Sequence, residues 1–243
     1  MKKLVVFLTV LLSLSLLIGC KTTGGGGSKL PSFGADLGAQ STPLGTVRVP
    51  YTSMISYFGY VKPGAEADEV VDGKKMFYLY VWIPAIAPEI GVRMVSPVKD
   101  LIAPTEKDFV DPSWEGGKTD MDNFFDTWVT FERAAEIINP EDIDAKIGTT
   151  KWIRYGTNDD SSELPAQPSG NKYNSVLRLT SEPSDPLKAL IRGLYRIGFT
   201  TYKVGEVQGT FVAQVGAPID LPGVVVVRDK AKLVEAINAA TKK

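Results

Sequence analysis

Oxygen-bearing side chains are the groups in this sequence that can bind a metal ion or carry out acid–base chemistry. The chain has 28 aspartate and glutamate residues, no histidine and one cysteine. Ser-His-Asp and Cys-His nucleophile systems are therefore excluded, and so is a zinc site built from imidazole and thiolate ligands. Carboxylates, hydroxyls, amides and carbonyls remain, and these hard ligands select calcium or magnesium over transition metals.

The one cysteine, Cys20, ends an apolar segment typical of a bacterial lipoprotein signal peptide. Lys2 and Lys3 form a positive start, residues 4–18 are too short to span a bilayer as a mature helix, and a glycine precedes the cysteine. We predict a signal peptide over residues 1–19 and lipidation of Cys20, whose acyl chains would anchor the protein to membrane lipid. An ordinary secretory signal with an incidental cysteine is the alternative.

Residues 20–44 are predicted to be a flexible tether between the lipid anchor and a folded domain over residues 45–243. Residues 21–28 are rich in glycine, serine and threonine, which cannot bury an apolar surface. Lysine rather than aspartate follows Cys20, which in this class of lipoprotein favours export to the outer membrane. The mature chain of 224 residues (20 to 243) is long enough for one large domain with a substantial core.

The charge of the mature chain argues against a nucleic-acid partner. Removing Lys2 and Lys3 with the leader leaves 25 basic residues against 28 acidic ones, a formal charge of −3. No block of lysine and arginine residues occurs in the sequence. A nucleic-acid-binding domain would instead carry a basic patch or stripe.

Short segments rich in β-branched and aromatic residues predict a mainly β fold. They cover residues 47–49, 55–61, 76–83, 92–95, 124–131, 152–155, 176–179, 194–202, 207–215 and 224–227. Turn sequences such as Pro63-Gly64 and Asp72-Gly73 separate them. Many short strands with few helices indicate a β-sandwich or jelly roll. The Lys-Val-Gly-Glu sequence at 203–206 predicts a hairpin between the strands on either side of it.

A few peripheral helices are expected beside the strands. Residues 131–138 and 186–192 could each form about two turns, and Pro140 with two acids after it could start another helix. Asp229 is a candidate N-cap for a C-terminal helix in which Leu233, Val234, Ile237 and Ala240 share one face. We expect that helix to dock onto the sandwich rather than to bind a membrane.

Six segments occur in the same order as in one known protein family. They are ISYFGYVKPG at 55–64, YLYVWIPA at 78–85, GVRMVSP at 91–97, FDTW at 125–128, NKYNS at 171–175 and LIRGLYRIGFTTY at 190–202. Over roughly residues 45–218 the chain resembles the leptospiral major outer-membrane surface lipoprotein family. The resemblance implies a calcium-binding jelly-roll domain that forms a homodimer, is displayed by a lipid anchor and adheres to extracellular matrix.

The same resemblance implies the ligands of the calcium ion. The matching positions are Asp126, Thr127, Asp159, Asp160 and Tyr173. Three carboxylates, two further oxygens and water would supply the six to eight oxygen ligands that calcium prefers. The family's long aspartate run is reduced here to Asn-Asp-Asp-Ser at 158–161, which lowers the local charge and, with it, the expected affinity. Taken alone, this short run is equally typical of a solvated turn.

Three functions agree with these observations. The leading interpretation is a non-catalytic outer-membrane surface lipoprotein with a calcium-binding domain that acts as an adhesin or ligand-binding module. A structural envelope lipoprotein that acts by self-association is the second. A glycosidase that uses paired carboxylates is the third, because that chemistry does not need histidine, although no acid pair can be assigned from the sequence.

Overall fold

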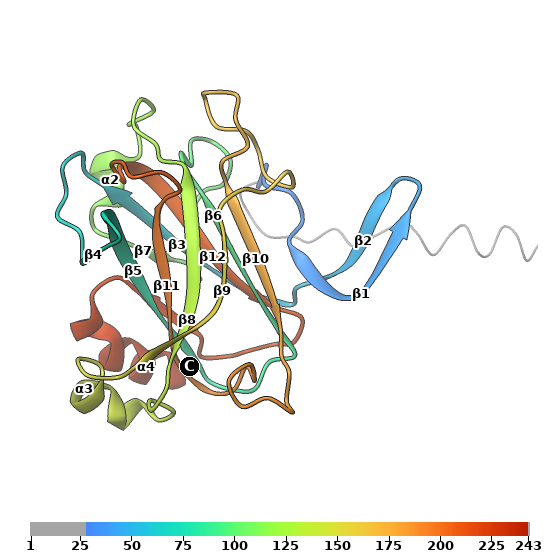
Figure 1. Ribbon diagram of the computed structural model, residues 1–243, viewed down its shortest axis with the longest axis vertical. Coiled ribbons are helices and arrows are strands. Elements are labelled where there is room, and N and C mark those ends of the chain that lie inside the picture. Colours follow the sequence, from blue (N-terminus) through green and yellow to red (C-terminus); the bar gives the residue numbers. More distant parts are fainter. Residues whose placement is uncertain (1–27, 243) are drawn as a thin grey trace, which may run out of the picture.

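The computed structural model describes residues 28–242, most of which form two facing β-sheets (Figure 1). One sheet has the strand order β10-β6-β12-β3-β7, and the other has the order β13-β5-β11-β8-β9 with β4 paired to β5. The first sheet contains β3 (Ser53–Val61), β6 (Glu89–Val95), β7 (Phe109–Val110), β10 (Ser175–Thr180) and β12 (Gly209–Ala217). The second contains β4 (Glu69–Val71), β5 (Lys74–Ile83), β8 (Thr127–Ala134), β9 (Trp152–Asn158), β11 (Gly193–Thr201) and β13 (Val225–Val227).

The chain crosses between the two sheets at almost every connection. Among the eight long strands of the sandwich, only β8 and β9 follow one another within the same sheet. The resulting orders, β10-β6-β12-β3 and β5-β11-β8-β9, are those of a double-sheet jelly roll. The predicted mainly β sandwich is confirmed.

The core lies between the sheets because alternate residues of each strand point inward. Val129 and Phe131 of β8 and Ile197 and Phe199 of β11 are fully buried there. The residues between them in sequence, such as Thr130, point to the outer face of the six-stranded sheet. Polar and charged side chains of β5, β8 and β11, such as Glu132 and Arg196, lie on that outer face.

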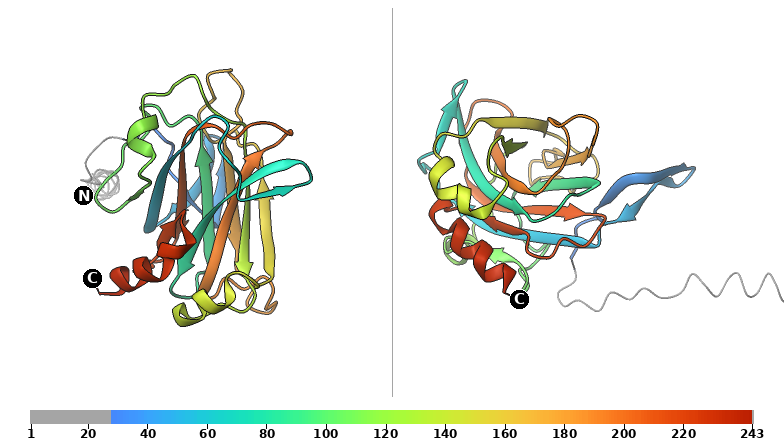
Figure 2. Two further views of the ribbon diagram at one scale, coloured as in Figure 1. Left: turned by 90° about the vertical axis from the view of Figure 1, so that its left-hand side faces the viewer. Right: turned by 90° about the horizontal axis from the view of Figure 1, so that it is seen from below.

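All ten predicted strand segments overlap observed strands, but three strands were not predicted. These are β4, β7 and β1 (Gly34–Thr42), which pairs with β2 (Gly45–Pro50) in a hairpin that projects from the sandwich (Figure 2). The sequence of β1 is rich in glycine and polar residues and lacks the β-branched pattern used for prediction.

The segment that leads into this hairpin corrects the predicted boundary of the tether, because part of residues 20–44 is packed against the domain. Leu30, Phe33 and Ala35 are buried in a second apolar cluster, which also contains Phe58 and Trp114. Residues 30–35 are therefore packed against the domain rather than being part of a free tether. The predicted signal peptide and Cys20 lie outside the described residues.

The predicted hairpin at 203–206 is wrong, because β11 and β12 lie in different sheets. Residues 202–208 instead carry the chain across the sandwich. Strand β11 pairs with β5 and β8, and β12 pairs with β3 and β6, so both edges of each strand are occupied by other strands.

Two of the four predicted helical segments form helices. Pro140–Asp142 (η2) leads into α3 (Ile143–Lys146), and Lys230–Lys232 (η3) leads into α4 (Leu233–Thr241), with the Asp229 side chain capping Ala231 N at 3.0 Å. Residues 131–138 are not helical because β8 continues to Ala134 through pairing with β9, and residues 186–192 form turns. A short helix that was not predicted, α2 (Trp114–Gly117), covers β3.

Both α3 and α4 lie at one end of the sandwich (Figure 2). Ile143, Leu233 and Ile237 pack there against Trp82, so the C-terminal helix docks on the domain as expected. No helix among residues 28–242 is long and apolar enough to cross a bilayer. The opposite end of the sandwich is built from loops.

Candidate metal centre

Three chain segments meet at the end of the sandwich opposite α3 and α4. Because β8 and β9 are antiparallel, the start of β8 lies beside the end of β9, with Val129 opposite Asn158. Asp126 directly precedes β8, and Asp159 and Asp160 directly follow β9. Tyr173 precedes β10 and bonds to the start of β8. The fold therefore gathers all five residues that the resemblance implied.

Thr127 and Tyr173 are joined directly. The backbone N–H and the hydroxyl of Thr127 both donate to the Tyr173 carbonyl oxygen, at 3.0 and 3.1 Å. The Ser175 hydroxyl lies 2.7 Å from the Thr127 hydroxyl and 2.7 Å from the Asp159 carbonyl oxygen. This small network ties the start of β8, the end of β9 and the start of β10 together.

Asp126 carries a carboxylate oxygen that lacks a partner. Its Oδ1 is buried and has no hydrogen-bond partner among the described residues. Burial, together with the negative charges of Asp160 and Asp159, raises the pKa of Asp126 to about 6, while Lys203 and Lys74 act in the opposite direction. Burial and Asp159 also raise the pKa of Asp160. A buried acid beside two more acids is an arrangement that could bind a cation.

The five residues adjoin one another without forming a finished coordination shell. Among residues 28–242, no group of three or more carboxylates is already arranged as metal ligands. The Tyr173 carbonyl already accepts two hydrogen bonds, which fill its two lone pairs. The Asp126 oxygen and the all-oxygen donor set fit a hard cation, whereas the Thr127 and Tyr173 oxygens would have to exchange existing bonds for it.

Two buried amides, to which the sequence assigned no role, hold the loops around this cluster. Gln167 Nε2 donates to the Ser96 and Phe125 carbonyl oxygens at 2.9 and 2.5 Å. Asn174 Oδ1 accepts from Ser96 N at 3.0 Å, and Asn174 Nδ2 donates to the Pro165 carbonyl oxygen at 2.7 Å. Asn174 and Ser175 belong to the NKYNS segment, so their sequence signal was present, whereas Gln167 lies outside the quoted segments.

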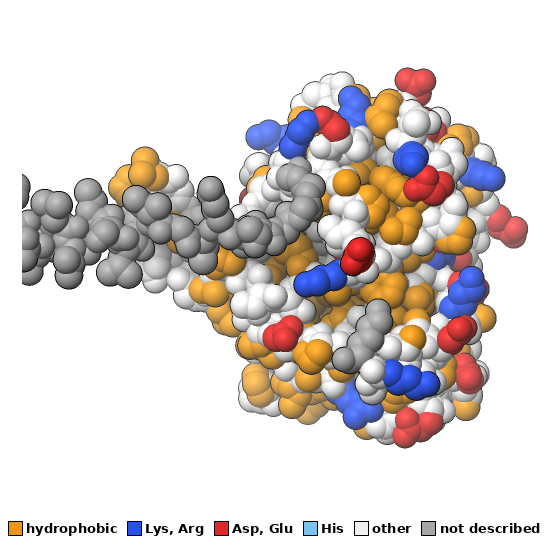
Figure 3. Space-filling view, turned by 180° about the vertical axis from the view of Figure 1, so that it is seen from behind, with side chains coloured by type: hydrophobic (Ala, Val, Ile, Leu, Met, Phe, Trp, Pro, Cys, Tyr) orange, Lys and Arg blue, Asp and Glu red, His pale blue; other side chains and the backbone are white. Residues whose placement is uncertain are grey.

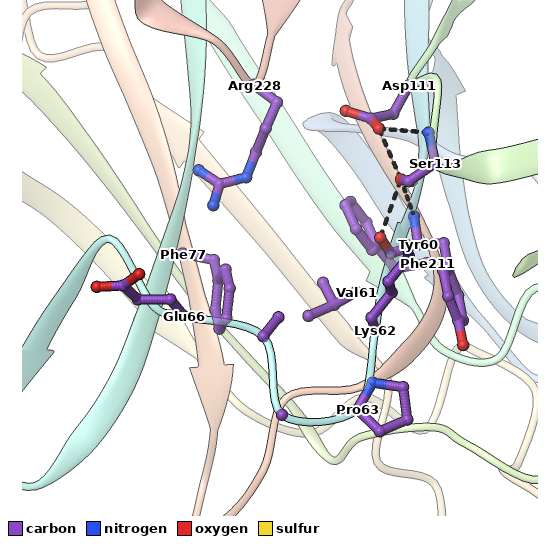
Figure 4. Close-up of a pocket in the computed structure, with 13 residues that line it drawn as sticks. Tyr60, Val61, Lys62, Pro63, Glu66, Phe77, Asp111, Ser113, Phe211 and Arg228 are labelled. Atoms are coloured by element: carbon purple, nitrogen blue, oxygen red, sulfur yellow. Dashed lines mark hydrogen bonds between the residues drawn. The ribbon is translucent and has the colours of Figure 1, made fainter. Parts of the chain in front are cut away.

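A cavity of about 480 Å³ lies beside the end of β3, with Phe77, Val61 and Phe211 on its apolar side (Figure 4). Two of its four charged groups, Asp111 and Arg228, are already paired. Asp111 accepts from the Tyr57 hydroxyl at 2.6 Å and from Ser113, and Arg228 bonds to Asp68 and to the Tyr78 carbonyl oxygen. Its other two charged groups, Lys62 and Glu66, are exposed.

The fold and this oxygen-rich cluster define a jelly-roll domain with a candidate site for a hard cation at one end. A family model for Lipl32, the surface lipoproteins of the order Spirochaetales, matches residues 45–226, and the chain belongs to this family. The match runs from β2 into β13 and confirms the predicted resemblance. None of the curated proteins compared with the chain matches it. Family membership makes this a surface lipoprotein, in agreement with the predicted outer-membrane location.

Proposed function

We propose that this protein is a non-catalytic, ligand-binding surface lipoprotein whose domain is stabilised by calcium. The observation that carries the proposal is the buried, unpartnered Oδ1 of Asp126 beside Asp159 and Asp160. A chain rarely leaves a buried carboxylate oxygen without a partner, because its desolvation is costly. A bound cation would supply the missing partner.

Asp126, Asp159 and Asp160 would provide the negative charge for the ion, and Thr127 and Tyr173 would provide further oxygens. Calcium accepts irregular sets of six to eight oxygens, whereas magnesium demands a stricter octahedron. The donor atoms come from three separate chain segments, so a shared ion would link the starts of β8 and β10 to the end of β9. Calcium is therefore expected to stabilise the fold rather than to take part in a reaction.

Isothermal titration calorimetry of the mature chain tests the calcium proposal. We expect one calcium site per chain, weaker binding of magnesium, and loss of calcium binding in Asp126→Asn. Asp122→Asn is the matched control, because Asp122 is a nearby exposed acid outside the cluster. Absence of calcium binding at millimolar metal, or equal binding by Asp126→Asn, would contradict the proposal.

The ligand is proposed to be a component outside the cell, with extracellular matrix as the first candidate. Support comes from membership in a family of surface lipoproteins. Binding of the mature protein to immobilised laminin, collagen and fibronectin, with and without calcium, tests this role. Absence of binding to all three would leave the structural envelope role as the better account.

A homodimer is also proposed, and the projecting β1–β2 hairpin supports it. Leu44 at its tip is fully exposed, and Val47 and Val49 are 61% and 44% exposed. Hydrophobic side chains also gather over the middle of the face seen in Figure 3, with charged side chains around them. Exposed apolar surface of this kind is typical of an interaction site. Analytical ultracentrifugation should detect a dimer that Leu44→Ser with Val47→Thr weakens, and a strictly monomeric wild-type protein would contradict it.

A further inference from the structure

The outer face of the six-stranded sheet carries a second, smaller cavity of about 260 Å³. We call it the outer-face pocket. Strands β5, β8 and β11 contribute to it, and the short hairpin formed by β4 and the start of β5 borders it. Its lining includes Thr130, Thr200, Tyr78, Trp128, Glu132 and Arg196.

Two buried hydroxyls in this lining have no partner. Thr130 is 3% exposed and Thr200 is 1% exposed, and neither hydroxyl forms a hydrogen bond within the described part of the chain. Leaving a buried hydroxyl unpaired costs free energy, so such groups are rare in folded proteins. Two of them in one pocket point to a polar occupant.

A glycine keeps the base of the outer-face pocket open. A Cβ atom on Gly198, which lies between Thr130 and Tyr78, would be 2.5 Å from Thr130 Oγ1 and 3.1 Å from Tyr78 Cε1. It would also be 3.0 Å from the Met76 methyl carbon. Any other residue at 198 would therefore press on the groups that line the pocket.

The charged groups of the lining offer both donors and acceptors. Both carboxylate oxygens of Glu132 are engaged, one by Arg196 Nε at 2.7 Å and the other by Arg154 Nε at 3.1 Å. The two guanidinium groups keep further N–H donors for a ligand. Glu69 accepts from the Tyr78 hydroxyl at 2.7 Å through one oxygen, which leaves its other oxygen as an acceptor. The three basic and three acidic residues of the lining balance.

The outer-face pocket continues into an adjoining cavity of about 560 Å³. The two cavities share Glu69, Tyr78 and Arg196. The Arg196 guanidinium lies between two rings, 3.9 Å from the centroid of Tyr78 and 4.3 Å from that of Trp152. The two cavities together thus have a wall of aromatic and arginine side chains.

We propose that the outer-face pocket binds a carbohydrate, with one sugar unit in the pocket and the next in the adjoining cavity. A sugar hydroxyl both donates and accepts hydrogen bonds, which matches a charge-balanced lining with two unpaired hydroxyls. The pocket is smaller than the roughly 300–1,000 Å³ of drug-sized ligand sites, as suits a single sugar ring. Both oxygens of Glu132 are engaged by arginines, so this carboxylate holds the wall of the site in place.

This inference names a ligand class for the ligand-binding role proposed above and rests on that role. The mature protein is screened on an array of neutral and acidic glycans. Saturation-transfer NMR then follows with methyl glycosides of glucose, galactose, mannose, N-acetylglucosamine and glucuronic acid. Each measurement is made in calcium and in EDTA, so that failure of the calcium site and failure of the sugar site can be told apart.

We expect at least one glycan to bind, and Gly198→Ala to weaken it tenfold or more. Gly116→Ala is the matched control, because a Cβ at 116 would meet no atom within 4 Å. The double variant Thr130→Val with Thr200→Val should also lose sugar binding while keeping its melting temperature. By contrast, Thr210→Val should lower the melting temperature and keep sugar binding, because the Thr210 hydroxyl accepts from Val98 N at 3.1 Å.

Three results would overturn the proposal. The first is that none of the glycans binds at millimolar concentration. The second is binding that survives both Gly198→Ala and the double threonine variant. The third is release of free sugar from a bound glycan, which would make the pocket a catalytic site.

Discussion

The loop between β9 and β10 carries acidic residues in two different surroundings: Glu163 lies among arginines, whereas Asp159 and Asp160 lie beside another acid. Glu163 is paired, since Arg178 donates to its two oxygens at 2.9 and 2.7 Å and Arg48 donates at 3.2 Å. Asp159 and Asp160, a few residues earlier, form no ion pair among the described residues. They lie beside Asp126, whose buried Oδ1 has no partner.

The pKa of Glu163 is lowered, whereas the pKa of Asp126 is raised. Hydrogen bonding to Arg178 lowers the pKa of Glu163, although partial burial opposes this. Burial and neighbouring acids raise the pKa of Asp126 to about 6. Glu163 is thus paired with cations, whereas the Asp126 cluster is left without a sufficient counter-charge. That difference is the physical reason for placing a metal ion at Asp126.

The largest expected effect comes from Glu89, a buried acid whose oxygens, unlike Oδ1 of Asp126, accept hydrogen bonds from neutral donors. Its carboxylate accepts from the Tyr51 hydroxyl at 2.8 Å and from Asp36 N at 3.0 Å, and it is fully buried. Glu89→Ala should lower the free energy of unfolding by about 2–4 kcal/mol, because both donors lose their acceptor. Urea denaturation measures this loss. Glu89→Gln keeps one acceptor and should cost less; equal costs would show that hydrogen bonding is not the cause.

Calcium should give the next largest effect. A ligand that binds only the folded state stabilises it by about 2.7 kcal/mol at a hundredfold excess over its dissociation constant. The melting temperature of the wild-type protein should therefore rise in saturating calcium, rise less in magnesium, and not rise in Asp126→Asn. Differential scanning calorimetry measures these shifts. The account fails if Asp126→Asn and the wild-type protein respond alike.

Substitutions of Glu163 and of the two aspartates should have different effects on stability and on the calcium-induced shift in melting temperature. Glu163→Gln should lower the free energy of unfolding by about 1 kcal/mol, because it weakens a partly exposed ion pair with Arg178, and should keep the calcium shift. Asp159→Asn and Asp160→Asn should lose most of the calcium shift while leaving the metal-free melting temperature unchanged or slightly higher, since repulsion is relieved. A calcium shift lost in Glu163→Gln and kept in both aspartate variants would reverse the comparison.

The smallest effect is a pH dependence that belongs to Asp126. Its folded-state pKa of about 6 lies above its ordinary value of 3.8, so the folded protein binds more protons than the unfolded chain between these pH values. In EDTA, the contribution of Asp126 to stability should therefore fall as the pH rises through this window. Melting curves of the wild-type protein and Asp126→Asn from pH 4 to pH 7.5 measure it by difference. A difference that does not change with pH would mean that the Asp126 pKa is not raised.

The sequence predicted the strands of the sandwich because they are rich in β-branched and aromatic residues and are separated by turn sequences. It missed β1, whose glycines hide the pattern, and it placed a hairpin between β11 and β12, because nothing local shows that a chain changes sheet. The ligand positions at Asp126, Asp159 and Tyr173 came from family resemblance, since three distant segments meet only in the fold. The outer-face pocket was not predictable, because Thr130 and Tyr78 become neighbours only through the strand order β5-β11-β8.

The most direct test of the unpartnered acid at Asp126 is an anomalous-difference map from crystals soaked in terbium, a lanthanide substitute for calcium. The account predicts one strong peak beside Asp126 Oδ1, within roughly the 2.3–2.6 Å at which oxygens bind calcium, with the oxygens of Asp159 or Asp160 also in reach. The peak should disappear when Asp126→Asn crystals are soaked. A map with no peak there, or with its main peak at Glu163, would contradict the account.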